Sequence, residues 1–223
     1  MNPLPTSTET SSAPPSGPRA WLRQGENLLL SSVLVALMVL PLLEAFLRKA
    51  FSTGVPGATA LVQHFTLIIA MLGGALAARD SRLLAMSALP AILPEKGKLF
   101  AALFSGTVAT TVALFLTLAG VEFVKTERES GNILVGTMPI WWIQTITPIG
   151  FALVTWRLLR NASPKWWGRA VVLVASGLLV WLATHPPTDP AKLVWPAIAT
   201  LLAATVLGAP IFVTLGGAAM ILF

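Results

Sequence analysis

The sequence has no cysteine, only two histidines and few charged residues, and each shortage excludes a class of function. Without cysteine, neither a disulfide framework nor a thiolate metal site can form. The two histidines, His64 and His185, are far apart in the sequence and support no metal chemistry. Charged residues make up only 11% of the chain, whereas a soluble domain carries about 25%. A catalytic centre built on a nucleophile–base pair or a metal is therefore poorly supported.

Long apolar runs dominate instead. Apolar residues make up 55% of the sequence, and they stand in continuous runs rather than alternating with polar residues. A run of about 20 residues, at about 1.5 Å per residue, matches a hydrocarbon core about 30 Å thick. Continuous runs favour helices over a barrel, whose strands would alternate. The sequence predicts an all-α integral membrane protein.

The chain is organised around the hairpin formed by its first two apolar runs. Helices are predicted over 27–51 and 58–78, joined by a short turn rich in glycine and proline. Later runs repeat this pattern, with prolines 41 and 148 predicting kinks inside the first and fourth helices. The remaining predicted elements are an interfacial amphipathic segment at 83–93, helices at 99–121, 137–159 and 170–184, and a last apolar run at 193–223 broken at Gly208-Ala209-Pro210.

The formal net charge of +6 reflects membrane topology rather than affinity for nucleic acid. Lys and Arg stand in short clusters between the apolar runs. With the amino-terminal tail and the second and fourth loops in the cytoplasm, ten of the 15 basic residues lie inside and five outside. This asymmetry predicts a cytoplasmic amino terminus.

Small residues recur at helical spacing in two predicted spans. Ala70, Gly74 and Ala78 stand every fourth residue, and Gly73 widens their smooth face. A second stripe runs through the third helix and includes Ala102, Gly106 and Thr110. Such stripes permit close contact between helices. They are the candidate helix-packing or subunit-interface residues.

Charged and aromatic residues gather at the span ends. Glu44 and Arg48 are four residues apart and can pair, either as a helix end reaching the aqueous interface or as a pair facing another subunit or the headgroup layer. The mixed-sign stretch 122–132 predicts a helix extension into water with a turn at Gly131-Asn132, or a docking surface for a soluble partner. The other candidate interfacial or lipid-anchoring residues are Arg79, Arg82, Trp141, Trp142, Arg157 and Arg160.

The order of these motifs resembles a known family. Glu-Ala-Phe-Leu-Arg-Lys-Ala-Phe at 44–51, then Val-Pro-Gly at 55–57 and a helix ending in Gly-Gly-Ala-Leu-Ala-Ala-Arg at 73–79, resembles the small membrane subunit (DctQ type) of tripartite ATP-independent periplasmic (TRAP) transporters. The stretch 138–159, with its Met-Pro-Ile-Trp-Trp start, resembles that family's fourth helix. The resemblance covers about residues 25–162. One departure is 59–64, which lacks the acidic residues often found there in the family.

The residues after 162 are the second departure, because the small subunit normally ends after four helices. Val-Leu-Gly-Ala-Pro-Ile-Phe at 206–212 resembles the start of the large (DctM type) subunit. A cytoplasmic end of the small unit and a periplasmic start of the large one require an odd number of connecting spans. The resemblance thus implies the front of a fused small–large permease. Its parts would be a disordered cytoplasmic tail (1–24), a four-helix unit (25–162), a connector transmembrane helix with its loop (163–190) and the start of the large subunit (191–223).

The resemblance implies a function in the bacterial inner membrane. A periplasmic solute-binding protein would deliver a solute, typically an organic acid, to a large subunit that moves it with sodium. The small subunit would brace that large subunit, whether the two are separate chains or parts of the same chain, and would need no cofactor. The residues suit such a scaffold, because the spans lack internal acids while aromatic and basic groups anchor them among the lipids.

Other functions remain alternatives. The chain could be an independent six-span secondary transporter whose binding helix breaks at 208–210, although its halves show no internal similarity that would indicate an inverted repeat. It could also be an assembly protein of another membrane complex. A membrane enzyme is the remaining alternative, and the separated histidines and missing cysteine argue against it.

Overall fold

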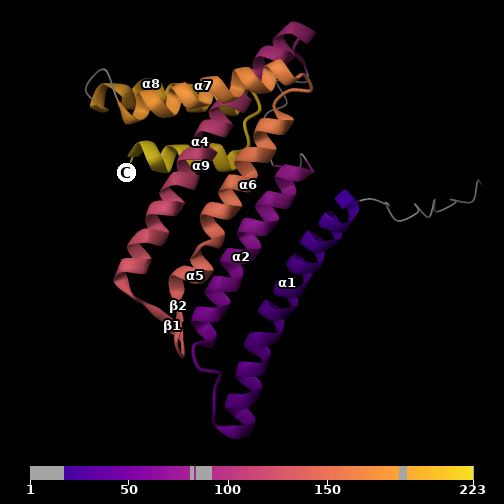
Figure 1. Cartoon of the computed structure of the whole chain (residues 1–223), viewed down its shortest axis with the longest axis vertical. Coiled ribbons are helices and arrows are strands. Elements are labelled where there is room, and N and C mark those ends of the chain that lie inside the picture. The colour runs from indigo at the N-terminus through magenta and orange to yellow at the C-terminus, as the bar shows by residue number, and fades with distance from the viewer. Residues whose placement is uncertain (1–17, 81–82, 84–91, 186–189, 223) are drawn as a thin grey trace, which may run out of the picture.

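The computed structural model describes residues 18–80, 83, 92–185 and 190–222. Helices α1, α2, α4 and the successive pair α5–α6 pack side by side, whereas α7, α8 and α9 lie across α4 (Figure 1). The elements are α1 (Pro18–Phe51), α2 (Ala58–Arg79), α4 (Glu95–Ser130), β1 (Ile133–Val135), β2 (Met138–Pro139), α5 (Ile140–Gln144), α6 (Ile146–Asn161), α7 (Trp166–Thr184), α8 (Pro190–Val206) and α9 (Ile211–Leu222).

Four helices are long and apolar enough to cross a membrane by length and composition: α1 from Trp21 onward, α2, α4 and α7. The α5–α6 pair would add a path about 33 Å long, which also suffices. The predicted all-α membrane fold and its four-helix unit are confirmed. Helix α7 has the length of a span, but it lies across α4 instead of alongside it (Figure 1).

Helix α1 begins earlier than the sequence analysis predicted. Residues 18–26 are helical, so the predicted disorder of 1–24 is wrong from Pro18 onward, and residues 1–17 lie outside the described part. Proline suits a first helical position, and the Ala, Leu, Arg, Gln and Glu that follow are good helix formers. An ion pair formed by Glu26 also ties this extension to the bundle. The helix continues through Pro41 without a break.

The other long helices agree with the prediction in position and extend beyond it. Helix α4 runs past the expected end at 121, and Gly131 follows it with a φ of 66°, so the predicted extension and turn are confirmed. The fourth predicted helix is divided at Thr145 into α5 and α6. Pro148 explains this break, because it has no N–H to donate to the carbonyl four residues earlier, at Gln144.

A small hairpin was not predicted from the sequence. Strands β1 and β2 pair antiparallel and fill the path from α4 to α5. The hairpin contacts the turn between α1 and α2, where a Cβ on Gly57 would stand 2.5 Å from Cγ2 of Val135. Gly57 also has a φ of 72°, so both its backbone angle and its neighbour require glycine.

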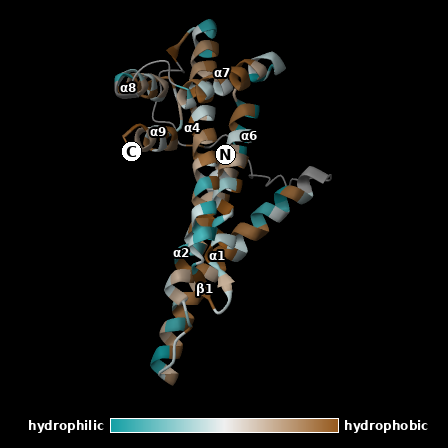
Figure 2. Cartoon of the chain, turned by 60° about the vertical axis from the view of Figure 1, so that its left-hand side comes forward, coloured by the Kyte–Doolittle hydropathy of each residue, from teal (hydrophilic) through white to brown (hydrophobic). Residues whose placement is uncertain are grey.

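Two apolar clusters hold the described chain together, and α4 is central to the larger one. Val108, Ala109 and Val112 of α4 pack on α8 and α9 residues such as Leu201 and Val213. The smaller cluster joins α2 to α6. It consists of Ala75, Ala78 and Val154. Hydrophobic residues also cover outward surfaces, as on α1 (Figure 2). Such a surface is expected in lipid, which is as apolar as the side chains.

Candidate functional site

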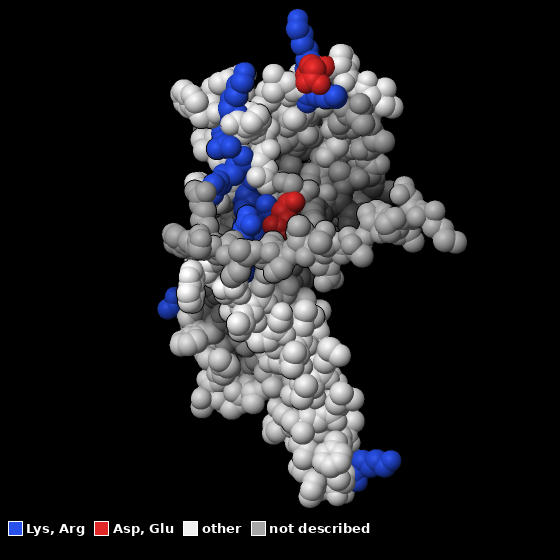
Figure 3. All heavy atoms as spheres, turned by 90° about the vertical axis from the view of Figure 1, so that its right-hand side faces the viewer, with Lys and Arg blue, Asp and Glu red and all other residues white. Residues whose placement is uncertain are grey.

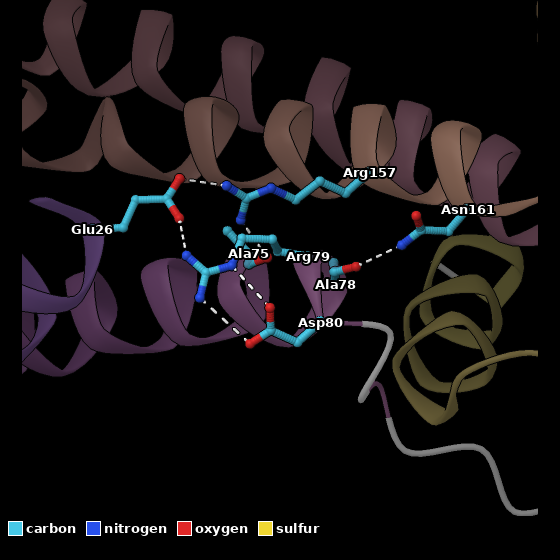
Figure 4. A network of polar contacts seen from close by, with 7 residues as sticks. All are labelled: Glu26, Ala75, Ala78, Arg79, Asp80, Arg157 and Asn161. Atoms are coloured by element: carbon cyan, nitrogen blue, oxygen red, sulfur yellow. Dashed lines mark hydrogen bonds and ion pairs between the residues drawn. The ribbon is translucent and has the colours of Figure 1, made fainter. Parts of the chain in front are cut away.

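One carboxylate joins three helices at one end of the bundle. Glu26 of α1 forms an ion pair with Arg79 of α2 at 2.6 Å and with Arg157 of α6 at 2.5 Å (Figure 4). Arg79 also pairs with the neighbouring Asp80 at 2.9 Å. Because α1 begins where α2 and α6 end, antiparallel packing brings these three residues together. We call Glu26, Arg79 and Arg157 the three-helix clamp.

Hydrogen bonds to backbone carbonyls lock α6 onto the end of α2. Arg157 donates to the carbonyl oxygen of Ala75 at 2.5 Å, and Nδ2 of Asn161 donates to that of Ala78 at 2.9 Å (Figure 4). The last four carbonyls of a helix have no partner within it, and Ala78 carries one of them. The end of α6 is therefore tied to the backbone of the last turns of α2.

The clamp is partly shielded from solvent. The side chains of Arg79 and Arg157 are only 17% and 13% exposed, and that of Glu26 is 31% exposed. An exposed ion pair contributes about 0 to 1 kcal/mol, whereas loss of one partner from a buried pair costs about 3 to 5 kcal/mol. The clamp lies between these limits, so its loss should have a measurable effect on stability.

A basic groove of about 520 Å³ opens beside the clamp. Lys and Arg gather over the upper part of this face, above a broad stretch where charge is scarce (Figure 3). The charged residues that line the groove are Glu26, Arg23, Arg79, Arg157, Arg160 and Arg169. The predicted interfacial residues Arg79, Arg157 and Arg160 thus come together from two helices. Arg82 and most of the predicted interfacial segment at 83–93 lie outside the described residues.

At the opposite end of the bundle, the predicted pair of Glu44 and Arg48 is confirmed, with Oε1 of Glu44 2.5 Å from Nη2 of Arg48. The second carboxylate oxygen accepts the backbone N–H of Val55 at 2.9 Å. Glu44 therefore closes the turn that joins α1 to α2. A Cβ on Gly54 would stand 3.0 Å from Oε1 of Glu44, so this turn fits closely around the carboxylate.

The predicted indole pair lies at the start of α5. The rings of Trp141 and Trp142 contact edge to face with centroids 5.8 Å apart, and the guanidinium of Arg128 stands 5.4 Å from the Trp141 centroid. This contact ties the extended end of α4 to α5 through a cation–π interaction. Trp142 is exposed, as an interfacial anchor would be.

The small-residue stripe of α2 is not where the helices of this chain approach most closely. Among the described residues, nothing lies within 4 Å of a Cβ placed on Gly73 or Gly74, and Ala70 and Ala102 are exposed. Only Ala78 of the α2 stripe is buried, next to Ala75. The predicted role of the stripes in binding another subunit stays a prediction.

Close approaches occur at other glycines. A Cβ on Gly120 of α4 would stand 3.3 Å from the backbone N and Cα of Pro148 in α6, and one on Gly150 of α6 would stand 2.8 Å from Cβ of Met71 in α2. Gly106, which was predicted, approaches Ala162 to 3.1 Å by the same measure.

Sequence reasoning missed Glu26, Asn161, Gly120 and Gly150. The signal for Glu26 was present, because it is a lone acid at the start of the first apolar run, while arginines end the second and fourth runs. Alternating spans bring these three ends to the same side of a membrane. Nothing local marks Gly120 or Gly150, since their neighbours belong to other helices. Among the described residues there is no group of three or more His, Asp or Glu that could hold a metal ion.

The match to a protein family decides the identification. Residues 37–166 match the DctQ component of tripartite ATP-independent periplasmic transporters, which is more than half of the chain. The chain belongs to the DctQ family. The matched range begins inside α1, includes α2, α4 and α5–α6, and ends at the first residue of α7.

Membership in the DctQ family makes this chain a small membrane subunit of a TRAP transporter, so the predicted family is confirmed. A comparison with curated proteins finds no match to the sequence. Glu26 of the three-helix clamp and helices α8 and α9 lie outside the matched range. The predicted fusion with a large subunit stays a prediction.

Proposed function

We propose that this DctQ protein is a rigid scaffold for the large permease subunit, in sodium-coupled uptake of organic acids supplied by a periplasmic binding protein. The observation that carries the proposal is the distribution of acids. No Asp or Glu occurs within 27–43, 58–79, 96–121, 140–161 or 166–184. A pathway for ions through these helices would need intramembrane polar ligands.

Helix α1 offers a surface for such a partner. Its two ends are held by Glu26 and Glu44, while the apolar flank between them is open, with Val35, Met38 and Leu42 58%, 69% and 70% exposed. Helix–helix contacts in membranes depend on van der Waals packing of such surfaces. A helix fixed at both ends presents this flank in a defined position, as a scaffold requires.

The charges of the described residues support a cytoplasmic amino terminus. The bundle end that carries the three-helix clamp also carries other exposed or half-exposed basic residues, namely Arg23, Lys96, Lys98, Arg160, Lys165 and Arg169. The opposite end carries fewer, namely Arg48, Lys49, Lys125 and Arg128. The positive-inside rule assigns the richer end to the cytoplasm.

Reconstitution tests the proposal. Proteoliposomes with this chain, the large subunit and the binding protein should take up an organic acid when a sodium gradient is present. Vesicles that lack either the large subunit or the binding protein should not. Sodium-coupled uptake by this polypeptide alone would overturn the scaffold assignment and favour an independent transporter.

A further inference from the structure

The basic groove beside the three-helix clamp has an apolar counterpart farther along the same helices. A second hollow of about 520 Å³ lies against the same two helices, α1 and α6, together with α5 and one residue of α2. Its lining is almost wholly apolar: Leu29, Val33, Ile68, Trp141, Trp142, Ile143, Thr145, Ile146 and Ile149. We call the two hollows together the α1–α6 groove.

The two parts follow each other in order along both helices. On α1, Arg23 and Glu26 line the basic part and Leu29 and Val33 line the apolar part. On α6, the order runs from Arg160 through Arg157 to Ile149 and Ile146 in the same direction. From Arg157 to Ile146 is about 16 Å along a helix, which is close to half of a hydrocarbon core of about 30 Å. Measured along the helices, the α1–α6 groove is therefore about as long as one lipid leaflet is thick.

The mouth of the groove carries uncompensated positive charge. Five arginines and one acid line the basic part, and both oxygens of that acid, Glu26, are engaged by Arg79 and Arg157. Among the described residues, Arg23 and Arg160 form no ion pair, and both are exposed. Guanidinium groups match phosphate oxygens in geometry and charge.

We propose that the α1–α6 groove binds one anionic glycerophospholipid, with its phosphate at Arg23 and Arg160 and an acyl chain along Leu29, Val33 and Ile149. A free phosphate would occupy only the basic mouth and leave the apolar part uncovered. A lipid fills both parts, and its depth in the membrane matches that of the groove. The site is independent of the transport reaction. The orientation proposed above puts it in the cytoplasmic leaflet, and only this assignment rests on the proposed function.

Native mass spectrometry of the purified full chain tests the site. Delipidated protein in detergent is mixed with phosphatidylglycerol or phosphatidylcholine of the same acyl chains, and the singly lipid-bound fraction is measured. The wild type should retain phosphatidylglycerol at least about tenfold better, because each basic residue near an anionic headgroup contributes to binding. Glycerol phosphate without acyl chains should not compete at the same concentration.

Two variants separate the headgroup from the tail. Arg23→Gln with Arg160→Gln should abolish the preference for phosphatidylglycerol. Ile149→Trp should weaken binding of both lipids by filling the apolar part. The matched control, Lys96→Gln with Lys165→Gln, removes two exposed basic residues from the same end of the bundle but outside the groove lining. The elution volume and melting temperature of each variant show whether it is folded.

Four results would overturn the proposal. The first is equal retention of the two lipids by the wild type, and the second is loss of the preference in the lysine control. The third is full competition by glycerol phosphate, which would indicate a site for a free phosphate anion. The fourth is stoichiometric displacement of phosphatidylglycerol by the large subunit, which would make that protein the occupant. None of these outcomes depends on transport, so the scaffold assignment stands or falls separately.

Discussion

Helices α1 and α4 are the two longest in the molecule, and they are held in opposite ways. They have 34 and 36 residues. None of the most apolar stretch of α1 is buried inside the chain, whereas 44% of that of α4 is. Helix α4 packs along its length on α6, α7, α8 and α9. Helix α1 contacts chiefly α2, with polar links near its two ends.

The difference shows how two membrane helices of similar composition take on different roles. The buried face of α4 consists mainly of small residues, including Ala101, Ser105, Ala109 and Ala113, which let neighbouring helices approach closely. The exposed face of α1 consists of large residues that no other described helix covers. Helix α4 is thus the internal support, and α1 presents a surface to lipid or to a partner.

The largest effect is expected where α4 meets α6. Gly120→Leu should destabilise the chain by about 3 kcal/mol or prevent folding, because the new side chain would meet the backbone of Pro148 at 3.3 Å. Thermal unfolding in detergent measures the change. Gly177→Leu on α7 is the matched control, since nothing described lies within 4 Å of that position. Equal melting temperatures for the two variants would show that this contact does not support α4.

A smaller effect is expected at the clamp that holds α1. Glu26→Gln should lower stability by about 1 to 2 kcal/mol, since it leaves Arg79 and Arg157 together without the acid between them. Proteolysis near the amino end of α1 should become faster while the rest of the bundle stays protected.

The control for the clamp is Glu95→Gln at the same end of the bundle. Its side chain is 90% exposed and, among the described residues, pairs only with Lys98, so its loss should have almost no effect. If Glu95→Gln opened α1 as readily as Glu26→Gln, the clamp would not be what holds this helix.

The smallest effect on the chain itself is expected at Gly74, where the consequence should appear in the complex. Gly74→Leu should leave stability unchanged or raise it by up to about 1 kcal/mol, because no described atom lies nearby and leucine favours a helix. Pull-down of the large subunit should nevertheless fall, since a leucine would block close approach. Glu44→Gln should reduce it less. Undiminished capture by Gly74→Leu would remove the stripe from the interface.

The sequence predicted the helices well and their ends less well. Helix α2 was predicted to within one residue, because a glycine–proline turn precedes it and charged residues follow it. The start of α1 was missed, since Pro18 to Glu26 carry no apolar periodicity and depend on a distant ion pair for their position. The hairpin of β1 and β2 was missed because strands of three and two residues leave almost no pattern.

The candidate site was predicted only in part, because its contacts also join residues that are distant in the sequence. Arg79, Arg157 and Arg160 were recognised as interfacial because basic residues at span ends follow a general rule. The convergence of Arg79 and Arg157 on Glu26 required the packing of three helices, because these arginines lie 53 and 131 residues from Glu26 in the sequence. The glycine stripe was predicted from spacing alone, but spacing does not indicate which side of a helix faces its neighbour.

The amino-acid sequence by itself determined that this protein is a helical membrane subunit without acids inside its spans. Transfer of long apolar runs into lipid depends on composition, and composition is local. Only the tertiary structure decided that α4 is buried, that α1 is held at its ends and that five arginines share one groove. Those features arise from contacts between distant residues, whose strength depends on distances that the order of residues does not specify.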